Sequence, residues 1–168
     1  MKITDLTLTL FKWEGIPAGI AKKHTGRIGG DSQLGLLTIS TDEGVDGHAF
    51  LGSSGRSAEF DAASLIHYLK PIVMGQNPLD REKLYEVMIL IERNTTIRAI
   101  GAVDIALWDI CGKIAGLPIH QLLGTYRDSI PAYVSSPRLA TAEDYANEAT
   151  EYRSRGLTGY KIHPPAVS

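Results

Sequence analysis

A lysine and a histidine two residues apart, Lys161 and His163, are the side chains of this sequence best suited to moving a proton. They close an apolar segment, 157–163, that is predicted to be a strand, and alternate residues of a strand lie on one face. A lysine whose pKa is lowered by burial and by neighbouring cations acts as a base near neutral pH, and histidine needs less adjustment. The pair could share the removal of a proton next to a carboxylate. The alternative is a solvated strand end, which this spacing alone favours.

A second group of candidates lies in the segment 12–32, which has no sustained hydrophobic period. Its middle is cationic, with Lys22, Lys23, His24 and Arg27. A connection of about twenty residues without regular structure is uncommon in a compact domain, and it is usually either functional or disordered. The cations would suit a substrate that carries a carboxylate. A solvated surface loop is the alternative, and composition alone favours it slightly.

The elements around Lys161 and His163 predict a strand, helix, strand unit. The segment 130–135 is a short apolar strand, 141–155 is a helix with Thr141 as its N-cap, and 157–163 is the second strand. Such units belong to parallel sheets, and in a β/α barrel the reactive residues stand at the C-terminal ends of the strands. We therefore expect residues 125–168 to be the start of a C-terminal β/α barrel, truncated because two strands do not make a domain.

Residues 1–124 are predicted to form a separate α+β domain. Alternation of apolar and polar residues predicts a three-stranded antiparallel meander, and helical spacing predicts a helical bundle after it. The expected strands are 4–11, 33–41 and 45–51, and the expected helices are 58–70, 80–92, 99–115 and 119–123. We expect Pro71 to end the first of these helices.

The helix over 99–115 shows the clearest apolar face. Its predicted buried stripe consists of Ile100, Val103, Leu107, Cys111 and Ile114. Asp104 falls inside the stripe, so we expect a buried carboxylate that bonds a neighbouring element. Asp109 lies opposite, where it can pair with Lys113 one turn later. The stretch around Gly116 is expected to end the helix.

The same stretch, residues 99–124, resembles the first signature of the mandelate racemase and muconate lactonizing enzyme family of the enolase superfamily. The matching residues are Ala99, Gly101, Ala102, Val103, Asp104, Ala106, Leu107, Asp109, Ile110, Gly112, Lys113, Pro118, Ile119, Leu122, Leu123 and Gly124. In that family the signature marks the helix that leads from the N-terminal capping domain into the barrel. The resemblance therefore implies that residues 1–124 are an enolase-like capping domain.

The resemblance also implies roles for the candidate residues. In the family the loop that corresponds to 12–32 closes over the active site, which makes Lys22, His24 and Arg27 substrate-binding candidates. The second barrel strand carries a Lys-x-Lys whose second lysine takes the α-proton. Lys161 matches the first position and His163 departs from the second, so we predict that Lys161 faces the substrate carboxylate and that His163 is the base or acid.

A divalent metal, usually Mg²⁺, is the cofactor that the resemblance implies. The family's metal ligands are carboxylates on the third, fourth and fifth barrel strands, which this sequence does not contain. We therefore expect the ligands beyond Ser168 and assign no metal ligand within the chain.

The predicted reaction is abstraction of the α-proton from a hydroxy- or sugar-acid carboxylate, with dehydration of an acid sugar as the outcome. Racemisation, epimerisation and cycloisomerisation by the same family are alternatives, since the fold does not fix the fate of the enediolate. The non-enzymatic alternative is a capping-domain fragment without catalytic activity. The 168 residues alone are expected to be inactive. An unrelated enzyme that uses Cys111 ranks below these, because no residue at informative spacing would activate the thiol.

Composition restricts the partners. The formal net charge is −2 and the chain has a single cysteine. There is no basic face for nucleic acid, no apolar run long enough for a bilayer and no signal-peptide core, so a cytoplasmic location is expected. The expected partner is a small anionic carboxylate. The family resemblance implies a homo-oligomer for the complete protein.

Overall fold

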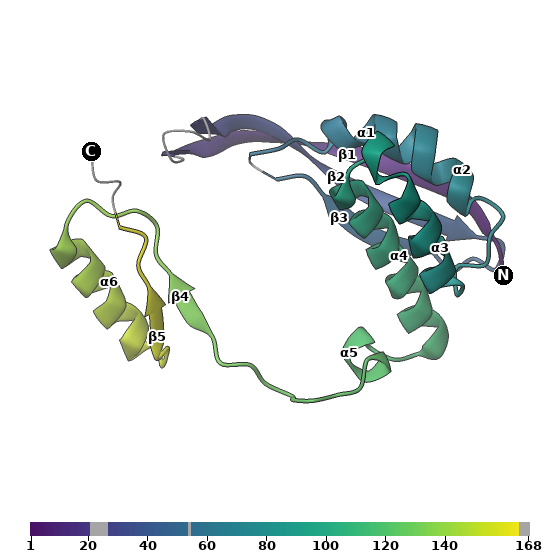
Figure 1. The fold of residues 1–168 in the computed structure, drawn as a ribbon. Helices are drawn as coiled ribbons and strands as arrows, with labels where there is room; N and C mark the ends of the chain where they lie inside the picture. Colours follow the sequence, from purple (N-terminus) through teal and green to yellow (C-terminus); the bar gives the residue numbers. More distant parts are fainter. Residues whose placement is uncertain (21–26, 54, 165–168) are drawn as a thin grey trace. The chain divides into compact units, whose positions relative to one another are not determined.

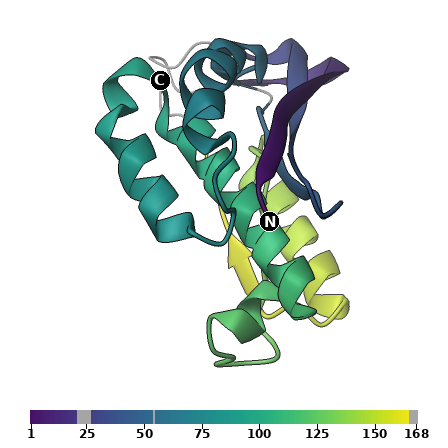
Figure 2. The ribbon, with the colours of Figure 1, turned by 90° about the vertical axis from the view of Figure 1, so that its right-hand side faces the viewer.

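The computed structural model describes residues 1–20, 27–53 and 55–164, without the side chains of 16–20 and 27–30. The chain divides into two compact units, Met1–Gly124 and Thr125–Ser168. Each unit is described by itself below, and Figures 1 and 2 show their elements.

The first unit contains a three-stranded antiparallel sheet in the order β1-β2-β3. Its strands are β1 (Ile3–Ile20), β2 (Arg27–Thr41) and β3 (Gly47–Leu51). Residues of β3 alternate between buried and exposed, because helices cover only one face of the sheet (Figure 1). The predicted meander is confirmed.

The expectation that 12–32 has no regular structure is wrong for 12–20 and 27–32, and residues 21–26 lie outside the described residues. Lys12 pairs with Gln33, and the ladder continues until Ile20 pairs with Arg27, so β1 and β2 extend past the other elements of the unit (Figure 1). The register shifts twice, between Trp13 and Ile16 and again before Gly19. Each irregularity breaks the period-two alternation by which a strand is recognised, so the sequence pattern concealed the pairing.

The helix predicted over 58–70 does not end at Pro71. It consists of α1 (Glu59–Ser64), a π-helical turn (Leu65–Leu69) and α2 (Lys70–Val73). Proline lacks an N–H, and in a regular α-helix its ring meets the carbonyl four residues earlier. The wider π turn directly before Pro71 changes that pairing, so the helix continues to Val73.

The first unit also contains three α-helices, α3 (Arg81–Leu90), α4 (Ile97–Ala115) and α5 (Ile119–Leu122), and a 3-10 turn over Glu92–Asn94. Thr96 caps the start of α4 by accepting a hydrogen bond from the Ala99 N–H at 3.1 Å. Gly116 ends it with φ 64°, a left-handed conformation that glycine adopts without strain. The predicted ending of this helix is therefore confirmed.

The buried face of α4 differs in part from the predicted stripe. Ile100, Val103 and Leu107 are fully buried as expected, but Cys111 is half-buried and Ile114 is 41% exposed. Helix α4 packs mainly against β3, and Ile110 takes the position in the core instead. The buried face of α4 therefore includes Ile110, and it excludes Ile114.

The predicted ion pair of α4 is present, and Asp104 bonds a neighbouring element as expected. Asp104 accepts a hydrogen bond from Arg81 of α3 at 3.2 Å, and the Arg81 guanidinium also stacks on Trp108. Asp109 pairs with Lys113 at 2.7 Å. Asp104 thus joins two helices as expected, but its side chain is 23% exposed and is only partly buried.

Replacing Gly47 by alanine is expected to destabilise the first unit by about 3 kcal/mol. An added Cβ would lie 2.1 Å from the Ala106 carbonyl oxygen and 2.7 Å from Ile110 Cγ1, so strand β3 would have to move away from α4. Gly101→Ala is the control, because its Cβ would meet nothing within 4 Å and alanine favours a helix by about 0.5–1 kcal/mol. Urea unfolding of both variants measures the difference, and equal stabilities would contradict the close approach of strand and helix.

The second unit is a strand, helix, strand arrangement. Its elements are β4 (Tyr133–Ser135), α6 (Ala142–Ser154) and β5 (Gly159–Lys161). The strands pair in parallel, as predicted, but both are shorter than expected. Thr141 and Asp144 form a reciprocal capping box at the start of α6. His163 therefore lies two residues beyond the strand.

In the part of the chain that the structure describes, none of the helices has the length and apolar character needed to span a bilayer.

Candidate active site

Lys161 is the last residue of β5, and His163 lies two residues beyond it, although the sequence predicted both residues within the strand. The Tyr160 hydroxyl bonds Glu148 of α6, and Ile162 lines a pocket with Tyr145, so these two side chains face the helix. Alternation along an extended chain directs Lys161 to the opposite face. The Lys161 side chain is exposed. A substrate on this face could therefore meet an ammonium group that is already in solvent.

The His163 imidazole contacts the segment that follows β4. Its Nδ1 lies 2.7 Å from the carbonyl oxygen of Ser136, and its backbone N–H donates to Ser136 Oγ at 3.2 Å. Ser136 is almost completely buried, and its own N–H donates to the Lys161 carbonyl oxygen. The end of β4 thus fixes both the ring and the backbone of His163.

On the helix side of the sheet, Tyr160 is held in its protonated form. Partial burial and the hydrogen bond to Glu148 raise the pKa of Tyr160 to about 12. A phenol with so high a pKa is a poor proton donor at neutral pH. The pair of Tyr160 and Glu148 therefore links α6 to β5 and is not suited to proton transfer.

The predicted substrate-binding residues Lys22, His24 and Arg27 belong to the first unit, whereas Lys161 and His163 belong to the second. Lys22 and His24 lie outside the described residues. Arg27 begins β2 and pairs with Ile20, but its side chain is not among those described. These three residues belong to the first unit, so their contact with a substrate remains a prediction.

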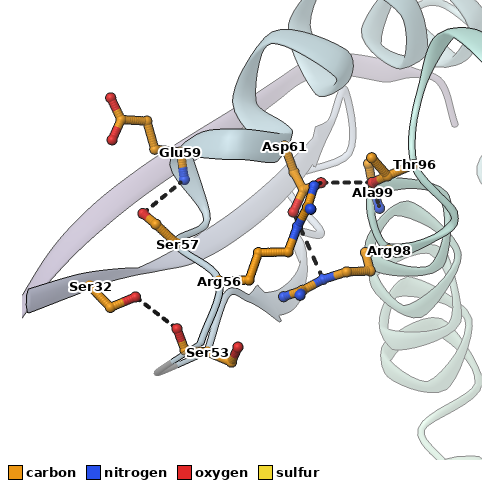
Figure 3. Close-up of polar contacts among 9 residues, drawn as sticks. All are labelled: Ser32, Ser53, Arg56, Ser57, Glu59, Asp61, Thr96, Arg98 and Ala99. Atoms are coloured by element: carbon orange, nitrogen blue, oxygen red, sulfur yellow. Dashed lines mark hydrogen bonds and ion pairs between the residues drawn. The ribbon is translucent and has the colours of Figure 1, made fainter. Parts of the chain in front are cut away.

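A buried polar cluster in the first unit was not predicted from the sequence (Figure 3). Its centre is Asp61 of α1, whose side chain is completely buried. The carboxylate accepts hydrogen bonds from Arg56 at 3.0 Å and from the Thr96 hydroxyl at 2.7 Å, and Arg98 Nε lies 3.9 Å away. One carboxylate is thus shared by two guanidinium groups and the N-cap of α4.

The cluster also anchors the turn between β3 and α1. Ser53 and Arg56 exchange backbone hydrogen bonds of 2.8 and 3.2 Å, and the Ser32 hydroxyl donates to the Ser53 carbonyl oxygen at 2.7 Å (Figure 3). A signal for this arrangement was present in the sequence. Asp61 precedes Leu65 by one helical turn, so it falls on the apolar face, where a carboxylate needs partners.

The residues that the structure describes do not fit a magnesium site. Among them, no group of three or more His, Cys, Asp or Glu side chains could hold a metal ion. A hard cation such as Mg²⁺ requires several oxygen ligands in near-octahedral geometry. The side chains around Lys161 and His163 provide no such set.

Comparison with known proteins identifies the family. Residues 14–124 match the family model described as mandelate racemase / muconate lactonizing enzyme, N-terminal domain. The chain belongs to this family. The resemblance noted over residues 99–124 is thereby confirmed, and so is the predicted fold class.

Curated members of the mandelate racemase / muconate lactonizing enzyme family are similar over three quarters of the chain. D-mannonate dehydratase of Sphingomonas sp. (strain SKA58) is 35% identical over 131 residues, which is 75% of this chain and 32% of that protein. N-succinyl-L-Arg/Lys racemase of Bacillus cereus is 33% identical over 137 residues, or 76% of this chain and 35% of that protein. The relatives thus include both a dehydratase and a racemase.

A solved structure with the same fold is D-glucarate dehydratase from Agrobacterium tumefaciens, complexed with magnesium. It matches with a TM-score of 0.79 and 28% identity, over 98% of this chain and 45% of that one. The chain therefore spans about a third of the length of the curated relatives and less than half of this solved relative.

Proposed function

We propose that this chain is the N-terminal part of a magnesium-dependent enzyme that removes the α-proton of a hydroxy- or sugar-acid carboxylate. Dehydration of an acid sugar is the proposed outcome. The observation that carries the proposal is the pair Lys161 and His163 at the end of β5, in a chain whose relatives include D-mannonate, D-xylonate and D-galactonate dehydratases.

In this proposal His163 accepts the α-proton and Lys161 stabilises the negative charge that develops on the substrate carboxylate. Loss of the proton leaves an enediolate, and protonated His163 can then return a proton to the departing β-hydroxyl, which leaves as water. An ammonium near the carboxylate favours the more negative intermediate over the ground state. Support comes from the exposed Lys161 and from the fixed ring of His163.

The remaining parts of the proposal concern the whole protein. Lys22, His24 and Arg27 bind the substrate, and residues 1–124 and 125–168 are a capping domain and the first part of a barrel. Magnesium is present in the D-glucarate dehydratase structure; bound to the whole protein it would supply positive charge for the substrate carboxylate, and we propose ligands outside this chain. The whole protein is proposed to be a homo-oligomer.

A racemase is the second candidate, favoured by the similarity to N-succinyl-L-Arg/Lys racemase. Both reactions begin with removal of the α-proton, but only the dehydratase then loses water. A racemase instead returns a proton to the α-carbon from the opposite face.

The test is incubation of the whole protein with a panel of acid sugars and N-succinyl amino acids in D₂O with magnesium. The proposed dehydratase converts an acid sugar into a 2-keto-3-deoxy acid, detected as the carbonyl product and by loss of the α-proton signal. Deuterium incorporation with inversion and no loss of water would favour the racemase. A whole protein that neither exchanges nor converts any of these carboxylates would contradict both.

A further inference from the structure

The contact between His163 and Ser136 determines which imidazole nitrogen carries the proton. Nδ1 lies 2.7 Å from the Ser136 carbonyl oxygen, and a carbonyl oxygen only accepts hydrogen bonds. Nδ1 must therefore carry the hydrogen. In the neutral ring the lone pair is then on Nε2, so the backbone of the neighbouring strand end determines the tautomer.

Tyr145 of α6 fixes the peptide group of the same histidine. Its side chain is buried, with 7% exposed. The hydroxyl donates to the His163 carbonyl oxygen at 2.6 Å and accepts a hydrogen bond from the Leu139 N–H at 2.9 Å. One hydroxyl thus joins the segment after β4 to the segment after β5, and a loss of this bridge would release His163 from one side.

We propose that His163 is held as the Nδ1–H tautomer, that Nε2 is the nitrogen that exchanges protons, and that Tyr145 is a positioning residue for it. The role of Nε2 as a base rests on the proposed function, whereas the tautomer and the part played by Tyr145 follow from the contacts alone. The Ser136 hydroxyl has a lesser part, since its contact with His163 is to the backbone N–H and not to the ring.

The direct test is ¹⁵N NMR of the imidazole nitrogens in the 168-residue chain labelled with ¹⁵N-histidine, at about pH 9, where an unperturbed imidazole is neutral. The His163 signals are assigned by their absence in His163→Gln. We expect a protonated Nδ1 and an unprotonated Nε2 for His163. A dominant Nε2–H tautomer would overturn the proposal.

Tyr145→Phe tests the positioning role, because it removes the hydroxyl and keeps the ring in its buried place. We expect the share of the Nε2–H tautomer to rise about fivefold and exchange of the Leu139 amide hydrogen to accelerate about fivefold, the effect of one lost hydrogen bond. An unchanged tautomer ratio in a folded Tyr145→Phe chain would remove Tyr145 from this role.

Two control variants separate positioning from general loosening. Tyr152→Phe alters another tyrosine of α6, whose ring lies against Arg155, and should leave the tautomer unchanged. Ser136→Ala removes the hydroxyl but keeps the carbonyl that Nδ1 contacts, so the Nδ1–H tautomer should persist. A loss of that tautomer in Ser136→Ala would assign the effect to the hydroxyl and contradict the role of the carbonyl.

Neutron diffraction from crystals of the whole protein provides an independent answer, because it locates the deuterium on the ring whatever the stability of the shorter chain. The experiments distinguish a failure of the proposed tautomer from a failure of the proposed function. An Nε2–H tautomer overturns this inference and leaves the α-proton reaction to be tested by isotope exchange. A confirmed Nδ1–H tautomer in a protein that exchanges no α-proton overturns the proposed function alone.

Discussion

Replacing His163 by alanine in the whole protein is expected to abolish deuterium exchange at the substrate α-carbon, with a loss of roughly a hundred- to ten-thousand-fold in rate. The variant should fold, because alanine keeps the backbone N–H and carbonyl that bond Ser136 and Tyr145. Only the ring's bond to the Ser136 carbonyl oxygen is lost, which accounts for about 1 kcal/mol. Exchange is followed by proton NMR in D₂O and folding by circular dichroism.

His67→Ala is the matched control for this variant. His67 lies on the surface of the π-helical turn in the first unit, and its replacement should change neither exchange nor stability. Exchange that continues unchanged in His163→Ala would exclude His163 from the mechanism. A rate loss accompanied by unfolding would instead assign it a structural role.

Replacing Asp61 by alanine is expected to lower the free energy of unfolding of the first unit by about 3 kcal/mol. The carboxylate is completely buried, and without it Arg56 and Arg98 have no counter-charge in the cluster and the Thr96 hydroxyl loses its acceptor. Both arginines are partly exposed, so solvent reduces the penalty, which places the estimate at the low end for a broken buried ion pair. Urea unfolding measures the change.

Two variants of the same helix show whether the buried charge is responsible. Glu59→Ala removes an exposed carboxylate that points away from the cluster (Figure 3), and the expected change is within about 0.5 kcal/mol. Asp61→Asn keeps an acceptor for the Thr96 hydroxyl but removes the negative charge, so its stability should lie between the other two. Equal losses for Asp61→Ala and Glu59→Ala would contradict the importance of the cluster.

Elements whose limits depend on local chemistry could be predicted from the sequence. Thr141 caps α6 and Gly116 ends α4 as expected, because a cap depends on one side chain or one dihedral angle within a few residues. The extension of β1 to Ile20 and the passage of a helix through Pro71 were not predicted. The strand extension contains two register shifts, and the helix contains a π turn before Pro71. Such irregular pairing interrupts the hydrophobic period on which the prediction relies.

In the candidate site, too, only features with a local sequence signal could be predicted. Lys161 and His163 could be recognised because they are two residues apart at the end of one strand, so their spacing alone related them. Ser136 and Tyr145 reach His163 only through parallel pairing of β4 with β5 and packing of α6, over sequence separations of 27 and 18 residues. Asp61 had a local signal, its position on the apolar face of α1, but its partners Thr96 and Arg98 come from another helix.

The long β1–β2 ladder has a consequence for how related proteins can diverge. β3 pairs with β2 only as far as Gly35, so the pairs from Lys12 to Ile20 form a two-stranded arm of roughly 25 Å. Inserting one residue into each strand would lengthen the arm by about 3.3 Å and reverse which side chains face each way, whereas two in each would preserve the faces and add about 7 Å. The length of the arm therefore changes in discrete steps through insertions and deletions, and these changes leave the sequences of the hydrophobic core and the helices unaltered.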